Sequence, residues 1–274
     1  MKYSVLMPIY YKENANNLEI SVDSMLNQTI RPNEFVIVED GKLTEELYDV
    51  IDKYKKNKIF KIIKLPTNRG LRYSLSIGVK ECSNEFIARM DSDDYAVSDR
   101  CEKELNEMIE KNLDIVGSNV GEFVNNIDNI VSYRIVPSSN EEIYKYSKKR
   151  DPFSHPSIMF RKSKVIEANY YYSEYLFEDY DLWIRMLRNN ARCYNIQEVL
   201  VLMRVNDNFY KRRGGIKYLK SMLMFRKHLY DIKYTTLCDY LSSSLAHILV
   251  CLIPNKLRKI IYLKLLRIEH KKAS

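Results

Sequence analysis

The sequence predicts an α/β fold built on a mostly parallel sheet, and three observations support this. Over about the first ninety residues, buried-strand runs alternate with segments of helical spacing. Several runs end in turn residues, as at Asp40-Gly41. The fourth run stops on an acidic cluster that begins at Asp91, where open α/β sheets bind ligands. Strands and helices that alternate in this way pair in parallel through right-handed crossovers.

The individual elements follow in order along the chain. Strands are predicted at residues 4–9, 34–39, 59–65 and 85–90, with helices between them at 18–26, 47–54 and 71–81. The next predicted elements are a helix at 100–112, a strand at 114–117, an antiparallel ribbon at 122–136, an apolar strand at 153–160, a helix at 179–187 and two short strands within 193–205. Beyond Gly214-Gly215 the pattern is helical, at residues 216–230, 236–253 and 255–269.

Bulk composition limits the class of protein. The 274 residues, 46% of them hydrophobic, suffice for one large domain or a domain with an appendage. The five cysteines are widely spaced and never form Cys-x-x-Cys, so neither a disulfide framework nor a zinc site is expected. The expected compartment is a reducing cytosol. The N-terminus runs into a strand without the features of a signal peptide. The longest apolar segment, 245–253, is long enough only for a buried or interfacial helix.

The positive charge belongs to the C-terminal quarter. Residues 204–274 hold 16 Lys and Arg against 4 Asp and Glu, a net charge of +12, whereas residues 1–203 carry −4. This distribution predicts contact with an anionic surface, and no nucleic acid is expected. A predicted amphipathic basic helix suits an anionic membrane; its residues are Leu257, Ile260, Ile261, Leu265 and Ile268 with Lys256, Arg258, Lys259, Lys264, Arg267, Lys271 and Lys272. The alternative is a solvated helix that packs on its own domain.

The clearest chemical motif is Asp91-Ser92-Asp93-Asp94, directly after a predicted strand. Neighbouring carboxylates repel one another unless a cation joins them. Oxygen ligands without nearby Cys or His suit Mg²⁺ or Mn²⁺, with phosphate oxygens completing the coordination. The alternative is an acidic helix cap before Ser98 or Asp99. The position after a buried strand favours the metal site.

Two further motifs fall at the same predicted sheet edge. Asp40, at the end of the second strand, could accept a hydrogen bond from a nucleotide base, or it is a turn residue beside Gly41. Residues 68–71 (NRGL) place polar side chains and a helix N-terminus where phosphate or base would bind, or they only start a helix.

A fourth motif, residues 177–183 (FEDYDLW), places acids at the start of a helix. A carboxylate at such a position can act as a general base toward a hydroxyl group. The helix dipole alone also favours acids there. Trp183 is interpreted as core or pocket wall rather than as a sugar platform.

Together these segments resemble the family 2 glycosyltransferases of the GT-A fold, a Rossmann-like fold for nucleotide-diphospho-sugar transferases, over residues 3–215. The resemblance rests on residues 4–10 (SVLMPIY), 38–41 (VEDG), 68–71 (NRGL), 88–94 (ARMDSDD) and 177–183. Residues 155–162 (HPSIMFRK) and 180–185 are similar to the exopolysaccharide and capsule subgroup typified by amylovoran-biosynthesis transferases. It implies a catalytic domain at 1–215 and a basic helical extension at 216–274.

The resemblance also implies an activity and its residues. The activity is an inverting, metal-dependent transfer from a UDP-sugar to a glycan or lipid-linked saccharide, in the cytoplasm on the inner face of the plasma membrane. Asp93, with Asp91, is implied as the metal ligand, and Asp179 as the base. The implied donor-binding residues are Pro8, Tyr10, Glu13, Asp40, Asn68, Arg89, Asp91 and Ser92. Further implied diphosphate or acceptor contacts are His155, Glu178, Trp183, Arg212 and Arg213.

Some positions depart from the family pattern and leave alternatives open. Tyr11 stands where many relatives have Asn, and residues 73–76 replace a more usual helix start, which bears on donor choice. Residues 212–215 offer cations to a diphosphate or form a surface loop. The competing functions are a nucleotide- or polyanion-binding module without catalysis and a sugar-nucleotide pyrophosphorylase. The latter class opens with a Gly-rich loop, whereas residues 8–17 contain no Gly.

Overall fold

The first four strands form the parallel half of one sheet in the computed structural model, which describes residues 1–173, 175–206, 209 and 211–269. β1 (Tyr3–Ile9) pairs in parallel with both β2 (Glu34–Glu39) and β4 (Phe86–Arg89), and β3 (Phe60–Lys64) pairs in parallel with β2. All of β1 is buried, as expected for a central strand with helices on both faces. The predicted alternation is therefore confirmed.

The second half of the sheet is mixed. β8 (Met159–Arg161) runs antiparallel between β4 and β6 (Ile115–Phe123), and β7 (Ile130–Arg134) then pairs antiparallel with β6. β9 (Cys193–Arg204) returns to the parallel direction beside β6 and holds the short β5 (Tyr95–Ala96). These pairings bring the C-terminal end of β9 next to the loop that follows β4.

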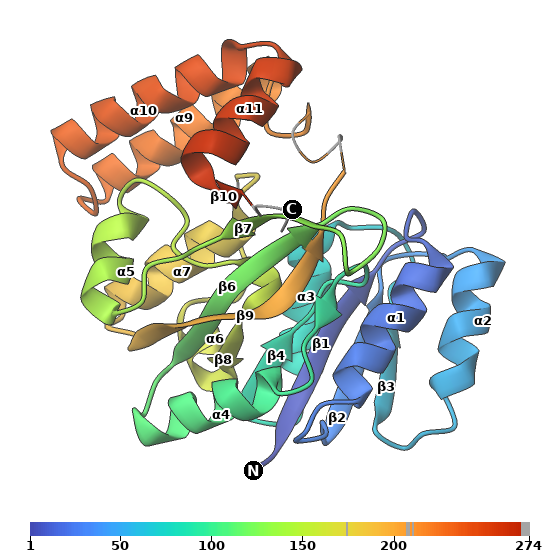
Figure 1. The fold of residues 1–274 in the computed structure, drawn as a ribbon. Coiled ribbons are helices and arrows are strands. Elements are labelled where there is room, and N and C mark those ends of the chain that lie inside the picture. Colours follow the sequence, from blue (N-terminus) through green and yellow to red (C-terminus); the bar gives the residue numbers. More distant parts are fainter. Residues whose placement is uncertain (174, 207–208, 210, 270–274) are drawn as a thin grey trace.

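Helices cover both faces of this sheet (Figure 1). One apolar layer contains α1 (Ala15–Leu26), α2 (Glu45–Tyr54) and α4 (Arg100–Glu110). The other contains α3 (Leu71–Glu81), α5 (Asn140–Ser147), α6 (Lys162–Glu167) and α7 (Glu178–Arg188). Along β1, Val5 and Met7 face the first layer and Leu6 faces the second, because successive side chains of a strand point to opposite faces.

Three helices that follow β9 gather at one end of the molecule (Figure 1): α9 (Ile216–Asp231), α10 (Leu237–Leu252) and α11 (Asn255–Leu266). α9 packs on α7 through an aromatic cluster in which Phe177 contacts Tyr218 and Tyr180 contacts Phe225. The buried Arg226 donates to the Tyr180 hydroxyl at 3.0 Å. Apolar packing thus crosses residue 215, where the sequence predicts a domain division.

Within the part of the chain that the structure describes, none of the helices combines the length and the apolar character that a membrane crossing requires. Of the predicted basic helix, Lys271 and Lys272 and the side chains of Lys264 and Leu265 lie outside the described residues.

Three predicted elements differ from the structure. The predicted strand at 153–160 is mostly a turn, because Pro156 lacks the N–H that a strand interior needs; a 3₁₀ helix (His155–Ser157) precedes β8. The two strands predicted within 193–205 are one strand, β9, whose pairing with β6 shifts register around Asn119. The helix predicted to reach residue 269 ends at Leu266, and β10 (Ile268–Glu269) instead pairs with β7.

Candidate active site

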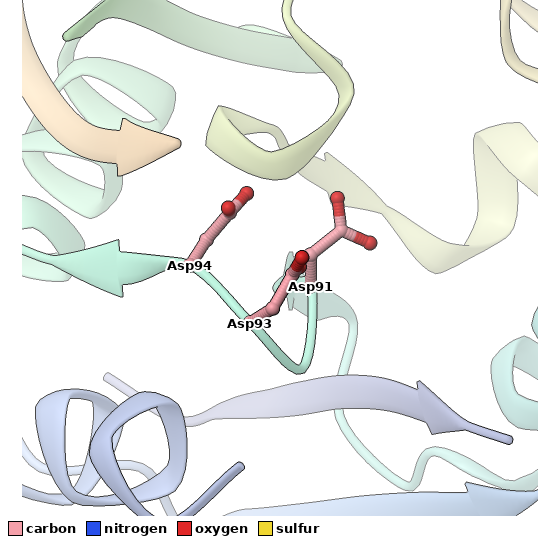
Figure 2. A group of neighbouring side chains, drawn as sticks. All are labelled: Asp91, Asp93 and Asp94. Atoms are coloured by element: carbon pink, nitrogen blue, oxygen red, sulfur yellow. The ribbon is translucent and has the colours of Figure 1, made fainter. Parts of the chain in front are cut away.

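Three aspartates converge on the loop between β4 and β5. Asp91, Asp93 and Asp94 extend to the same side of this loop (Figure 2), and each offers a carboxylate oxygen within 4.8 Å of the others. Asp94 Oδ1 accepts a hydrogen bond from the backbone N–H of Arg204 at 2.8 Å. Its Oδ2 is buried and has no hydrogen-bond partner among the described residues. Asp94 therefore joins the two acids that the sequence predicts as metal ligands.

Electrostatic repulsion within this group is only partly relieved by the charges of Arg89 and Arg204. Burial and the charges of Asp91 and Glu13 raise the pKa of Asp93 to about 7, and burial with the charge of Asp93 raises the pKa of Asp94 well above its ordinary value. A buried, unpartnered carboxylate oxygen in a set of hard donors is what a divalent cation would complete. The residues present thus fit Mg²⁺ or Mn²⁺.

Arg204 is a site residue that the sequence reasoning missed. Besides its backbone bond to Asp94, its Nε donates to the carbonyl of Asp93 at 3.1 Å and its Nη1 to the carbonyl of Asn125 at 2.7 Å. It therefore fixes the acidic loop from the end of β9. The sequence offers only a weak signal for it, a cation at the end of a predicted strand within 193–205.

Arg89 is a buried cation beside the metal-site acids. Its buried guanidinium donates to Asp91 through Nη2, while Nε and Nη1 find no partner among the described residues. Burial raises the pKa of both Asp94 and Glu178, and the charge of Arg89 acts against that rise at each. Arg89 thus interacts electrostatically with an acid from each of the two predicted motifs.

The residues predicted to line the uridine pocket lie at the end of β1 and in the loop after it. Glu13 accepts hydrogen bonds from the N–H of Asn14 and from the hydroxyl of Ser92, both at 2.8 Å. It thereby ties the loop after β1 to the acidic loop. Pro8 is buried within β1, whereas the Tyr10 side chain is 41% exposed and free to meet a ligand.

Asp40 joins two of the predicted motifs into one structure. Its Oδ1 accepts the N–H of Arg69 at 2.7 Å and its Oδ2 accepts the N–H of Gly70 at 2.9 Å. Gly41 has a φ of 86°, and a Cβ built there would lie 2.6 Å from the backbone nitrogen of Asn68. The Asp-Gly turn is thus fitted against the turn that presents Asn68.

Replacing Gly41 by alanine is expected to disturb this contact. The positive φ and the clash with backbone atoms should together cost about 1–3 kcal/mol of unfolding free energy, and the displaced turn should raise the KM for the nucleotide-sugar donor that the resemblance implies. Denaturant titration and donor kinetics measure the two effects. Gly215→Ala is the matched control, because Gly215 has the same φ of 86° but nothing within 4 Å of its Cβ position. Equal effects of both variants on KM would contradict the interpretation.

The acids of α7 form the second part of the site. Asp179 Oδ1 accepts the N–H of Tyr180 at 2.8 Å, and Oδ2 lies 3.9 Å from Nδ1 of His155. Burial and the charge of Asp179 raise the pKa of Glu178 to about 7 and that of Asp151 to about 7. With 25% of its side chain exposed, Asp179 can reach a ligand.

His155 and Trp183 support these acids from the core. Burial and the charge of Arg89 lower the pKa of His155 well below its ordinary value, so its ring is neutral. His155 Nε2 lies 3.2 Å from the Tyr171 hydroxyl, and the Trp183 ring contacts His155 edge-on. Trp183 is fully buried, which agrees with its interpretation as a core residue, and it presents no face to a sugar.

The predicted arginine pair lies between β9 and α9. Arg212 is exposed, whereas Arg213 stacks on Phe209 at 3.6 Å and donates to the carbonyl of that residue at 2.9 Å. The charges of Arg213 and Asp179 both act on Tyr218, whose pKa burial raises. Arg213 thus acts on Tyr218 of α9, which packs on Phe177 at the start of α7.

Sequence comparisons with known proteins identify the family. The model of Glycosyl transferase family 2 matches residues 4–168. An Escherichia coli protein described as UDP-Gal:alpha-D-GlcNAc-diphosphoundecaprenol beta-1,3-galactosyltransferase is 39% identical over 97% of both chains. The amylovoran biosynthesis glycosyltransferase AmsE of Erwinia amylovora is 31% identical over 96% of this chain and 98% of its own.

Solved structures show the same fold. S. aureus TarS 1-349 in complex with UDP-GlcNAc aligns with a TM-score of 0.61 at 18% identity, over 95% of this chain and 70% of that one. The mannosyltransferase PcManGT from Pyrobaculum calidifontis, in complex with GDP-Man and Mn²⁺, aligns with a TM-score of 0.64 at 12% identity, over 96% and 81%. These likenesses confirm the GT-A fold. Together with the family match and the curated relatives, they show that this chain belongs to glycosyl transferase family 2.

Proposed function

We propose that this glycosyltransferase moves a sugar from a UDP-sugar to a hydroxyl of a lipid-linked or growing saccharide, with inversion at the anomeric carbon. The observation that carries the proposal is a three-aspartate cluster beside the buried Arg89, whose charge also acts on Glu178 and on His155, the residue 3.9 Å from Asp179. The nearly full-length relative with 39% identity, described as acting from UDP-Gal on a diphosphoundecaprenol-linked sugar, supports the donor and acceptor classes.

Asp91, Asp93 and Asp94 would hold the Mn²⁺ or Mg²⁺, which when bound neutralises negative charge on a diphosphate leaving group. Arg204 keeps this loop in place through its bonds to Asp93 and Asp94. Because the cluster follows β4 at the carboxyl end of a parallel strand, it meets the donor where α/β sheets bind nucleotides.

Asp179 is the proposed general base. Its Oδ2 is too far from His155 for a hydrogen bond, so this oxygen is available to accept the proton of the acceptor hydroxyl. The acceptor oxygen then bonds to the anomeric carbon as the bond to the UDP oxygen breaks. Attack on the face opposite the departing diphosphate inverts the configuration.

The donor nucleoside would lie over the turns that follow β1 and β2. Tyr10 and Asn68 are exposed there, while Glu13 and Asp40 fix the two turns through their backbone contacts. Asp40 keeps unused lone pairs on both oxygens and is proposed to accept a further hydrogen bond from uracil.

The setting follows from the proposed acceptor. A lipid-linked saccharide is held at a membrane, and the C-terminal quarter carries the positive charge that an anionic surface attracts. We therefore propose that the enzyme works in the cytoplasm, peripherally on the inner face of the plasma membrane.

The release of UDP from a panel of UDP-sugars tests the function. UDP-galactose is the first donor to try, and we expect release in Mn²⁺ or Mg²⁺ that stops when a chelator is added. Nucleotide binding without release from any donor would favour a non-catalytic binding module. Consumption of a nucleoside triphosphate with a sugar phosphate would favour a pyrophosphorylase.

A further inference from the structure

α10 exposes large apolar side chains and buries small ones, which is the reverse of the usual pattern for a helix at the surface of a protein. Its exposed face carries five leucines, spaced by four, four, four and three residues, with 51% to 62% of each side chain exposed. We call them the leucine stripe: Leu237, Leu241, Leu245, Leu249 and Leu252. The residues it buries against the protein are Ser243, Ser244 and Cys251. A helix normally turns its apolar face inward.

The leucine stripe has almost no charge on its own helix. Asp239 is the only Asp, Glu, Lys or Arg of α10. Leu257 and Ile260 of α11, about half exposed, add to the exposed apolar side chains that follow the stripe. Exposed apolar surface of this extent marks an interaction site rather than a solvated face.

Arg258 of α11 does not face an anionic surface, as the basic composition of this helix predicts, but contacts α10. This side chain is buried and turned toward the end of α10, where it donates to the carbonyls of Val250, Cys251 and Ile253 at 2.8–2.9 Å. Val250 and Cys251 are in the last turn of α10, and Ile253 caps it. The carbonyls at such a helix end have no helical N–H group from which to accept a hydrogen bond. α11 thus secures α10, and the larger apolar face belongs to α10.

We infer that the leucine stripe inserts into the interfacial layer of an anionic membrane, with α10 lying in the plane of the surface. A helix of 16 residues is about 24 Å long, too short to cross a hydrocarbon core of about 30 Å. An apolar face beside basic segments is the pattern of interfacial helices. The inference deepens the proposed function and rests on it, because a lipid-linked acceptor is presented at such a surface.

Charge favours a membrane over a second copy of the chain as the occupant. A symmetric dimer through α10 would bring together two C-terminal segments that each carry a net charge of +12. An anionic lipid surface instead attracts that charge and repels the body of the enzyme, which carries −4. Both effects orient the stripe toward lipid.

Co-sedimentation of the full chain with vesicles tests the inference. We expect binding to mixed phosphatidylglycerol and phosphatidylcholine vesicles, weaker binding to phosphatidylcholine alone, and weakening as salt rises. Leu245→Gln with Leu249→Gln should lower the affinity about ten-fold or more. The matched control is Ile109→Gln with Ile166→Gln, which replaces exposed apolar side chains on α4 and α6 and should retain wild-type binding.

A fluorescent variant keeps the test independent of the double variant's folding. Trp183 is buried, so the emission of Leu245→Trp should shift to shorter wavelength on adding anionic vesicles, whereas Ile109→Trp should not respond. Unchanged vesicle binding by the leucine double variant, or no shift at residue 245, would overturn the inference. So would sedimentation velocity that shows a wild-type dimer broken by the double variant, since a second copy would then cover the stripe.

UDP release in solution separates this inference from the proposed function. A double variant that releases UDP like the wild type but no longer binds vesicles supports both. Vesicle binding through the stripe without any UDP release would refute the proposed function alone. Release of UDP with no vesicle binding by the wild type would refute the membrane contact alone.

Discussion

Asp179→Asn should lower kcat for sugar transfer by about 10²–10⁴-fold, the usual contribution of a general base. The amide keeps the size of the side chain and its acceptor oxygen for the N–H of Tyr180, but it cannot take the acceptor proton. The fold should remain intact or gain stability, because the charge of Asp179 raises the pKa of both Glu178 and Asp151. Steady-state transfer and thermal unfolding, measured on the same preparation, check both parts.

Asp231→Asn is the control for this prediction. It makes the same chemical change at an exposed ion pair with Lys227 on α9, where kcat should not change. If Asp179→Asn turned over at a rate close to that of the wild type, another residue would have to be the base, and Glu178 would be the first to examine.

Asp93→Ala should abolish metal-dependent transfer and also the metal's effect on stability. A cation that binds only the folded enzyme stabilises it by about 2.7 kcal/mol at a hundred times its Kd. We expect Mn²⁺ to raise the wild-type Tm and leave that of the variant unchanged. In chelator the variant should be as stable as the wild type or more so, since Asp93 helps raise the pKa of the buried Asp94.

Asp99→Ala provides the comparison, because Asp99 lies on the same connection but is paired with Lys103 at the surface. This variant should keep both the Mn²⁺-dependent activity and the Tm shift. A wild-type Tm that does not respond to Mn²⁺ or Mg²⁺, together with full activity in chelator, would refute the metal site.

Local patterns in the sequence sufficed for the parallel half of the fold. The bounds predicted for β2 and α3 match the structure, because alternating strands and helices with clear turns define them locally. The antiparallel half depends on pairing between distant segments. The short β5 and β8 exist because β9 and β4 lie beside them, and no periodicity of their own marks them.

In the candidate site, too, residues in local motifs were predictable, whereas contacts between distant segments were not. The motifs and the resemblance predicted the acids of the β4–β5 loop and of α7, and Arg89, which donates to Asp91, also acts on Glu178. The role of Arg204 could not be predicted from a local motif, because its contact with Asp93 joins residues more than a hundred positions apart. The bond from Asp40 to the turn at Gly70 likewise needs the sheet order, which places β2 beside the turn after β3.

The aromatic contacts between α7 and α9 bear on how such enzymes diversify. Because Phe177 and Tyr180 flank the proposed base and pack against Tyr218 and Phe225, a recombination event at residue 215 would leave an unmatched aromatic surface beside Asp179. A new C-terminal segment would therefore preserve the surroundings of Asp179 only if it restored that packing. The extension and the catalytic helix are expected to change together during evolution, as one heritable unit.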